Sequence, residues 1–281
     1  MKTTINKIKV AAIGMLALTG MLGSLPAQTI MLDFGPTDTA ASKLNVAPYV
    51  DTVSGTNTWV KLLTTDNASV DTVTVNETGI TLNIGLGTAS TINFYGEKTI
   101  RSNALGSSYS TQSTLFATAT PGIDGIFAVD TNPNGPNALG LQISGLEAGS
   151  YEIYIVGFNT NSGNNELREK FYFNTTTAWN PNEDIEYSSW ESESVAYLRS
   201  TLTPATATWE EEADYAKFSF NIGSNEIVSL VAIGTGTADN SPEYRGFFNA
   251  IQIVQQIPEP STWFLLSVGL GTLVLIRRRR R

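Results

Sequence analysis

Short runs of β-branched and aromatic residues, separated by turn-forming residues, recur along most of this chain. The turns are spaced roughly 8 to 12 residues apart, which is typical of all-β sandwiches and barrels. In the clearest run apolar and polar residues alternate, so Tyr151, Ile153 and Ile155 share one face of the predicted strand. No stretch upstream of residue 257 has the period of an amphipathic helix. The sequence therefore predicts an all-β fold, an antiparallel β-sandwich, over residues 28–256.

The predicted strands are runs rich in Val, Ile, Thr and aromatic residues, and the predicted loops are rich in Ser, Gly, Asn and Pro. The glycine turn at residues 223–225 joins two strong runs into a predicted hairpin. We expect strands at residues 30–35, 57–63, 70–75, 80–84, 92–95, 139–143, 151–158, 171–173, 216–222, 226–233 and 247–254, and loops at 102–113 and 131–137.

Residues 257–281 have a different composition and are not predicted to belong to the sandwich. Two prolines, Pro258 and Pro260, flank Glu259 and cannot continue a sheet or sit inside a helix. They are followed by an uncharged apolar run, residues 261–276, and by a basic tail of five residues: Arg277, Arg278, Arg279, Arg280 and Arg281.

The apolar run is predicted to form a transmembrane helix. At ~1.5 Å per residue its sixteen residues span roughly 24 Å, short of the ~30 Å hydrocarbon core. Such a helix crosses if the bilayer thins or the flanking arginines snorkel. The arginines keep the C-terminus cytoplasmic and place the preceding residues outside the cytoplasm. A plain C-terminal anchor, or a buried helix with a charged end, also explains the apolar run alone.

The order Pro-Glu-Pro, short apolar span and terminal arginine cluster resembles the PEP-CTERM sorting signal of exported bacterial proteins. The resemblance covers residues 258–281, and it implies an exosortase as processing partner. It indicates where the chain is delivered and gives no information about the activity of residues 28–256.

The N-terminus has the layout of a secretory signal peptide, residues 1–27. Lys2, Lys7 and Lys9 precede an apolar stretch, residues 10–22, and a small-residue exit ends at Ala27. We expect Sec-type export followed by cleavage after Ala27. An uncleaved N-terminal anchor is the alternative, and the glycines within the short apolar stretch disfavour it.

The body between the two ends is strongly acidic. Residues 28–257 contain nine Lys and Arg against twenty-five Asp and Glu, a formal charge of −16. Such a surface repels phosphates, so we expect no nucleic-acid partner. The chain has no Cys and no His, which excludes disulfides, the usual zinc ligand sets and His-based catalysis. About 230 residues suffice to bury a core without such crosslinks.

The second half of the body resembles the galactose-binding-like jelly rolls, which include many carbohydrate-binding modules. The resemblance rests on Gly145-Leu146, on the strand from Tyr151 to Ile155, on the late hairpin and on the closing run from Phe248 to Ile253. It implies two packed antiparallel sheets, and a glycan site has to be argued from its own residues.

Residues 174–214 combine aromatic rings with carboxylates and are the candidate glycan-binding region. Rings stack on the apolar face of a sugar, and carboxylates accept its hydroxyl protons. The alternative is a solvated acidic loop whose rings pack against the sandwich. The candidate glycan-binding residues are Trp179, Tyr187, Trp190 and Trp209.

Two further chemistries use the same carboxylates. Glu210, Glu212 and Asp214 are weak candidates for a calcium site, with Asp33 as a lesser contributor, although the sequence contains no Asp-x-Asp-x-Asp-Gly loop. Glycoside hydrolysis needs two carboxylates at a set separation, and the sequence offers no way to choose the pair.

We therefore expect an exported, non-enzymatic protein of the cell envelope or extracellular matrix, with no catalytic residues and no required cofactor. Extracellular polysaccharide and the membrane are its expected partners. A carboxylate-dependent glycoside hydrolase and a plain membrane-anchored structural protein are the alternatives.

Overall fold

The computed structural model describes most of the strands of the body and the turns between them. The described residues are 29–36, 60–64, 68–70, 72–75, 79–104, 124–128, 137–157, 166–177, 183–198, 211–212, 215–235 and 245–256. They lie within one compact unit, Gln28–Gln256. Over these ranges the chain forms strands and no helix, which confirms the all-β prediction. The predicted signal peptide, transmembrane helix and basic tail lie outside the described residues.

One layer is a five-stranded sheet in the order β14-β10-β17-β1-β2. Neighbouring strands are antiparallel, except that β2 runs parallel to β1. The first and last strands of the body lie side by side, with Thr29 opposite Val254. The bounds are β1 (Thr29–Pro36), β2 (Val60–Thr64), β10 (Gly149–Val156), β14 (Ala216–Ile222) and β17 (Ala250–Gln256).

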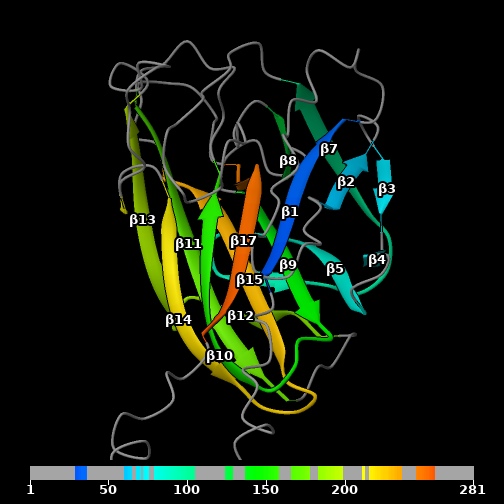
Figure 1. Ribbon diagram of the computed structural model, residues 1–281. Helices are drawn as coiled ribbons and strands as arrows, with labels where there is room; N and C mark the ends of the chain where they lie inside the picture. Colours follow the sequence, from blue (N-terminus) through cyan, green and yellow to red (C-terminus); the bar gives the residue numbers. More distant parts are fainter. Residues whose placement is uncertain are drawn as a thin grey trace, which may run out of the picture. The chain divides into compact units, whose positions relative to one another are not determined.

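The opposite layer is an eight-stranded sheet in the order β12-β6-β5-β9-β15-β11-β13, with β4 also paired to β5. Figure 1 shows β10, β17 and β14 of the first layer in front of β11 and β15 of this sheet. The bounds are β4 (Thr72–Val75), β5 (Ile80–Gly87), β6 (Thr91–Asn93), β9 (Ala138–Ser144), β11 (Glu166–Thr176), β12 (Ile185–Glu186), β13 (Glu191–Leu198) and β15 (Ile227–Gly234).

A four-stranded sheet in the order β16-β8-β7-β3 adds residues to the same core. Ile100 of β7, Ile126 of β8 and Phe248 of β16 belong to the central hydrophobic cluster. The bounds are β3 (Ala68–Val70), β7 (Lys98–Ala104), β8 (Asp124–Ala128) and β16 (Phe247–Phe248).

The central core is built by period-two alternation on both large sheets. Tyr151, Ile153 and Ile155 of β10 are at most 1% exposed, as the sequence pattern predicts. They belong to one cluster with Leu141 of β9 and Leu230 of β15 from the opposite sheet. Two sheets that bury one face each against the other are a β-sandwich. This arrangement is consistent with the jelly-roll resemblance.

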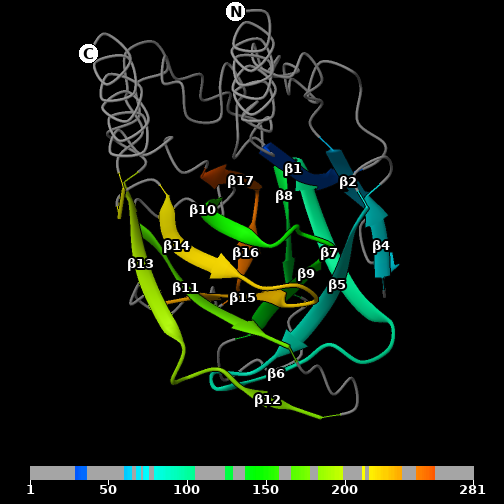
Figure 2. The same ribbon diagram turned by 60° about the horizontal axis from the view of Figure 1, so that its bottom comes forward.

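The outer face of the eight-stranded sheet carries a second, smaller hydrophobic cluster, to which Ile92 of β6 and Ile185 of β12 contribute. Figure 2 shows β6 and β12 next to each other at the bottom of the view. Phe94 follows β6 and lies on two paired glycines, Gly85 of β5 and Gly140 of β9. A Cβ at Gly85 or Gly140 would lie 2.6 or 2.8 Å from the Phe94 ring, which is closer than atoms pack. The two glycines therefore leave the space that seats this ring.

The strongest sequence patterns give strands close to their predicted positions, and the weaker ones do not. β14 has the predicted bounds, 216–222. β7, β8, β12 and β13 were not predicted, and residues 102–104, predicted as loop, end β7. The sequence of β13, Glu-Ser-Glu-Ser-Val-Ala-Tyr-Leu, is polar in its first half because it is an outer strand of its sheet.

Candidate functional site

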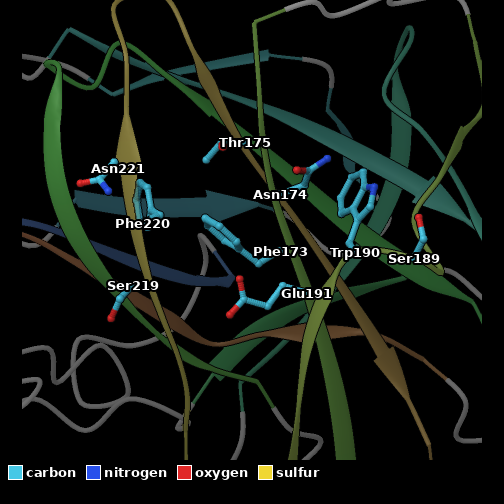
Figure 3. Close-up of a pocket in the computed structure, with 9 residues that line it drawn as sticks. All are labelled: Phe173, Asn174, Thr175, Ser189, Trp190, Glu191, Ser219, Phe220 and Asn221. Carbon is cyan, nitrogen blue, oxygen red and sulfur yellow. The ribbon is translucent and has the colours of Figure 1, made fainter.

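A groove of about 590 Å³ lies between the end of β11 and the end of β14 (Figure 3). It is lined by two phenylalanines, one tryptophan, one carboxylate, and hydroxyl and amide side chains. The lining residues are Phe173, Asn174, Thr175, Ser189, Trp190, Glu191, Ser219, Phe220 and Asn221.

The groove exists because β11 is longer than its neighbour β13. The ladder between these strands begins with Glu191 opposite Phe173, whereas β11 continues to Thr176. Residues 174–176 pair with β15 on one side, and the described part of β13 does not reach them on the other. The space left there is bounded across the sandwich by β14, the outer strand of the five-stranded sheet.

Trp190 forms one wall of the groove and is half-buried. Its backbone N–H donates to the carbonyl of Tyr187 at 3.0 Å, which closes a tight turn before β13. Its ring meets the Tyr187 ring edge-on, with centroids 6.2 Å apart and an interplanar angle of 64°. Because Trp190 packs against the second hydrophobic cluster, the ring is held in place while part of it remains accessible.

Polar side chains on β14 line the opposite wall. Alternation on β14 buries Phe218 and Phe220 and exposes Ser219 and Asn221. The Ser150 hydroxyl donates to Asn221 Oδ1 at 2.5 Å. Because this contact uses the carbonyl oxygen of the amide, the two donors of the Asn221 amide remain for other partners.

Glu193, two residues after the groove residue Glu191, joins the two sheets. Its carboxylate accepts a hydrogen bond from the backbone N–H of Lys217, on the outer edge of β14. Burial raises the pKa of Glu193 above its ordinary value, and the carboxylates of Glu211, Glu212 and Glu191 raise it further, while the Lys217 hydrogen bond acts in the opposite direction.

The Lys217 side chain points to the outer face of the five-stranded sheet. Its ammonium lies 2.7 Å from Glu152 Oε1 and 5.5 Å from the centroid of the Tyr154 ring. The Tyr154 hydroxyl donates to Glu152 Oε2 at 2.6 Å, and Gln256 Nε2 donates to the same oxygen at 3.1 Å. Hydrogen bonds from Lys217 and Tyr154 lower the pKa of Glu152, and burial followed by the Glu152 hydrogen bond raises the pKa of Tyr154.

Of the four candidate glycan-binding aromatics, the structure places Trp190 in the groove and Tyr187 in the core. Tyr187 is 0% exposed, its ring meets Tyr172 at 4.9 Å, and its hydroxyl donates to the carbonyl of Thr88. Burial raises the pKa of that hydroxyl. A ring without an accessible face cannot stack on a sugar, so Tyr187 supports Trp190 from behind. Trp179 and Trp209 lie outside the described residues.

The calcium candidates are only partly described. Glu212 is exposed and adopts a left-handed backbone conformation (φ 63°), whereas Glu210 and Asp214 lie outside the described residues, as does the side chain of Asp33. Within the described ranges, no three acidic side chains gather closely enough to hold a metal ion.

The sorting residues Pro258, Glu259 and Pro260 and the arginines Arg277 to Arg281 also lie outside the described residues. Over the part of the chain that is described, no helix is long and apolar enough to span a bilayer.

The candidate glycan-binding region, residues 174–214, includes five of the nine groove residues. Phe173 lies directly before this region on β11, and Ser219, Phe220 and Asn221 come from β14. The alternation of β14 signals that Ser219 and Asn221 face solvent. Nothing local in the sequence signals that this strand ends beside β11, because that proximity follows from the packing of the two sheets.

Comparison with known proteins identifies the C-terminal segment. Residues 256–281 match the family model described as "PEP-CTERM protein-sorting motif". No curated protein matches the chain. One similar solved structure is the enzymatically active domain of tailspike protein 4 of bacteriophage CBA120. It has 7% identity and a TM-score of 0.24 over 62% of this chain, and the match spans 19% of the tailspike chain.

The chain is therefore a β-sandwich protein that carries a C-terminal PEP-CTERM sorting motif. The motif implies an exported, membrane-associated protein with an exosortase as its processing partner.

Proposed function

We propose that this protein is a non-enzymatic glycan-binding protein of the cell envelope or extracellular matrix, and that its ligand binds in the groove beside Trp190. The signal peptide and the sorting motif deliver the body to the far side of the membrane, with the arginine tail cytoplasmic until the motif is processed. Extracellular polysaccharide is the class of ligand.

The position of Trp190 carries this proposal. A ring supported from behind by Tyr187 stays rigid, and its accessible part offers an apolar surface to a pyranose. Hydroxyl and amide groups from three chain segments converge on the same space: Asn174, Ser189, Ser219 and Asn221. An apolar platform with a few convergent polar groups is the usual composition of a small-ligand site.

The arrangement of carboxylates favours binding over hydrolysis. A glycosidase places two carboxyl groups on either side of the scissile bond. Among the described lining residues Glu191 is the one carboxylate, and its neighbour Glu193 is engaged by the backbone of Lys217. Binding of this kind uses no catalytic residue and no metal ion.

Trp190→Ala tests the proposal. Affinity electrophoresis of the full chain through gels that contain single polysaccharides measures retention by each one. We expect at least one polysaccharide to retain the wild-type protein, and Trp190→Ala to weaken that retention about tenfold, the scale of one lost aromatic stacking contact. Released reducing ends in the same gels would support hydrolysis.

Tyr95→Ala is the matched control, since Tyr95 is a 58% exposed aromatic outside the groove. Asn174→Ala, which removes a polar groove contact without touching the aromatic cluster, guards against a folding defect in the Trp190 variant. Retention that is equal in the wild type and in both groove variants would refute the site.

A further inference from the structure

Strand β17 closes the five-stranded sheet, because it lies between β10 and β1 (Figure 1). Its residues 250–254 pair on both sides, so that Val254 lies opposite Thr29 of β1 and Glu152 of β10. Without β17 the described sheet would separate into two pairs of strands, β14 with β10 and β1 with β2. The sides of β10 and β1 that face β17 would then be unpaired edges. This strand therefore completes its sheet instead of extending it.

The same strand also supplies side chains to the centre of the core. Ile251 and Ile253 are 0% exposed and belong to the central hydrophobic cluster. Ile253 lies opposite Ile153 of β10 and Ile30 of β1, which are buried as well. Deleting one buried aliphatic side chain already removes a large share of the stability of an average domain. Loss of both isoleucines together with two hydrogen-bonded ladders should therefore prevent the body from staying folded.

In chain order β17 is the last of the described strands of the body, and its partner β1 is the first. Thr29 and Val254 are paired although they come from opposite ends of the body's sequence. Because a chain is synthesised from its N-terminus, β1 and β10 exist well before the strand that joins them. Contacts between such distant segments form late, since the intervening chain has to be ordered first. The earlier strands therefore remain incomplete until residues 250–256 follow.

The sorting motif begins where β17 ends. Gln256 is both the last residue of β17 and the first residue of the segment that matches the motif. It lies opposite Ser150 of β10, and its side-chain amide donates to Glu152 Oε2 at 3.1 Å. The strand that completes the body and the segment that directs its sorting are therefore contiguous in the sequence.

From this topology we infer that β17 is a closing strand that couples completion of the body to the sorting motif. The body reaches its compact fold when residues 250–256 dock between β10 and β1, and these residues become available together with the motif. A chain that stops before residue 250 lacks both the closing strand and the motif, so it is neither folded nor sorted. Processing within residues 257–281 leaves all of β17 in the body and preserves the fold.

Two stop positions test this inference by trypsin digestion in one detergent, with loss of the body followed on gels. A stop after Gln256 removes the motif and keeps β17, whereas a stop after Asn249 removes both. We expect the body to disappear at the same rate in the full chain and in the chain that stops after Gln256, because residues 28–256 form a compact unit of their own. The chain that stops after Asn249 should lose it at least about a hundredfold faster, since cleavage follows the population of the unfolded state.

A synthetic peptide distinguishes a missing strand from general damage to the body. The peptide Ala250–Gln256 is added to the chain that stops after Asn249, where it can enter the sheet as an extended strand. We expect saturating peptide to slow digestion of this chain at least about tenfold. The matched control peptide carries Ile251→Asp and Ile253→Asp, which would bury two carboxylates in the core, and it should give no protection. Neither peptide should affect the full chain, in which β17 occupies this position.

Equal resistance of the full chain and the chain that stops after Asn249 would overturn the inference, because β17 would then be dispensable. Rapid digestion of the chain that stops after Gln256 would also overturn it, since the fold would then require the motif itself. Protection by both peptides, or by neither, would show that docking of the two isoleucines does not complete the body, and the inference would be wrong. None of these measurements involves a glycan, so each outcome leaves the proposed binding function to its own test.

Discussion

The carboxylates of Glu152 and Glu193 both contact Lys217, and their pKa values are shifted in opposite directions. Glu152 meets the ammonium of Lys217, and its pKa falls; Glu193 meets the backbone N–H of Lys217, and its pKa rises. The difference lies in the partner, because an ammonium stabilises the ionised form with a full charge. A backbone N–H supplies only a dipole, which burial and three neighbouring carboxylates outweigh at Glu193.

This comparison shows that the two sides of β14 have different roles. On the outer face of its sheet a closed network of Glu152, Tyr154 and Lys217 satisfies its own charges. On its edge the Glu193 carboxylate meets a backbone N–H and lies near other carboxylates, without a cationic partner among its described contacts. The charges are therefore balanced on the first side and unbalanced on the second.

Glu193→Ala should have the largest effect on stability. It removes the acceptor of a partly buried backbone N–H and with it a hydrogen bond that joins β13 to β14. We expect the free energy of unfolding to fall by about 1–2 kcal/mol in urea denaturation at pH 7. Glu191→Ala, an exposed position on the same strand, should change it by less than about 0.5 kcal/mol. Equal losses in the two variants would show that the edge contact contributes nothing.

Lys217→Met should have a smaller effect and sharpen the contrast. The side chains of Lys217 and Glu152 are 25% and 24% exposed, so their ion pair contributes only about 1 kcal/mol. The backbone hydrogen bond to Glu193 survives this substitution. Denaturation at two salt concentrations checks the origin of the loss, because an ion pair weakens at high salt. Lys170→Met, which removes an ammonium 4.7 Å from the Tyr172 ring, is the control for a lost cation–π contact.

The smallest expected effect is on the pH dependence of the free energy of unfolding. Glu152 and Glu193 should contribute to it in opposite directions. The pKa of Glu152 is lower in the folded state, so its contribution is present above the ordinary value of 4.5 and is lost as the pH falls through the folded pKa. The pKa of Glu193 is higher in the folded state, so its contribution is greatest below 4.5 and declines as the pH rises through the folded pKa.

Glu193→Gln keeps a hydrogen-bond acceptor without the charge. Urea titrations from pH 3 to pH 8 should show that this variant loses the decline above about pH 4.5, while Glu152→Gln loses the decline below it. Parallel pH profiles of the wild type and Glu193→Gln would contradict the raised pKa of this carboxylate.

The sequence predicts the parts of the molecule whose pattern is local. Alternation in β10 and β14 identifies both strands and the face each one buries, because a half-buried strand has to alternate. The same argument fails for β13, whose outer position permits Glu and Ser where a central strand requires apolar residues. It also fails to separate Trp190 from Tyr187, since two aromatics three residues apart give no indication of which one is buried in the second hydrophobic cluster.

The groove could not be predicted because two strand lengths and one interlayer contact create it. β11 extends by residues 174–176 beyond its ladder with β13, and the end of β14 lies beside this extension. None of these relations is encoded within a single stretch of residues. The acidic surroundings of the groove are easier to predict, because the many carboxylates of residues 183–214 can be read directly from the sequence.

The position of β17 determines how the body responds to tension on its C-terminus. This strand is held between β10 and β1, and its hydrogen bonds are perpendicular to its axis. A pull along β17 therefore loads both ladders in shear, and many hydrogen bonds must rupture together instead of opening one after another. Tension at this end is therefore resisted by both ladders at once, which suits a body whose last strand leads directly into a sorting motif.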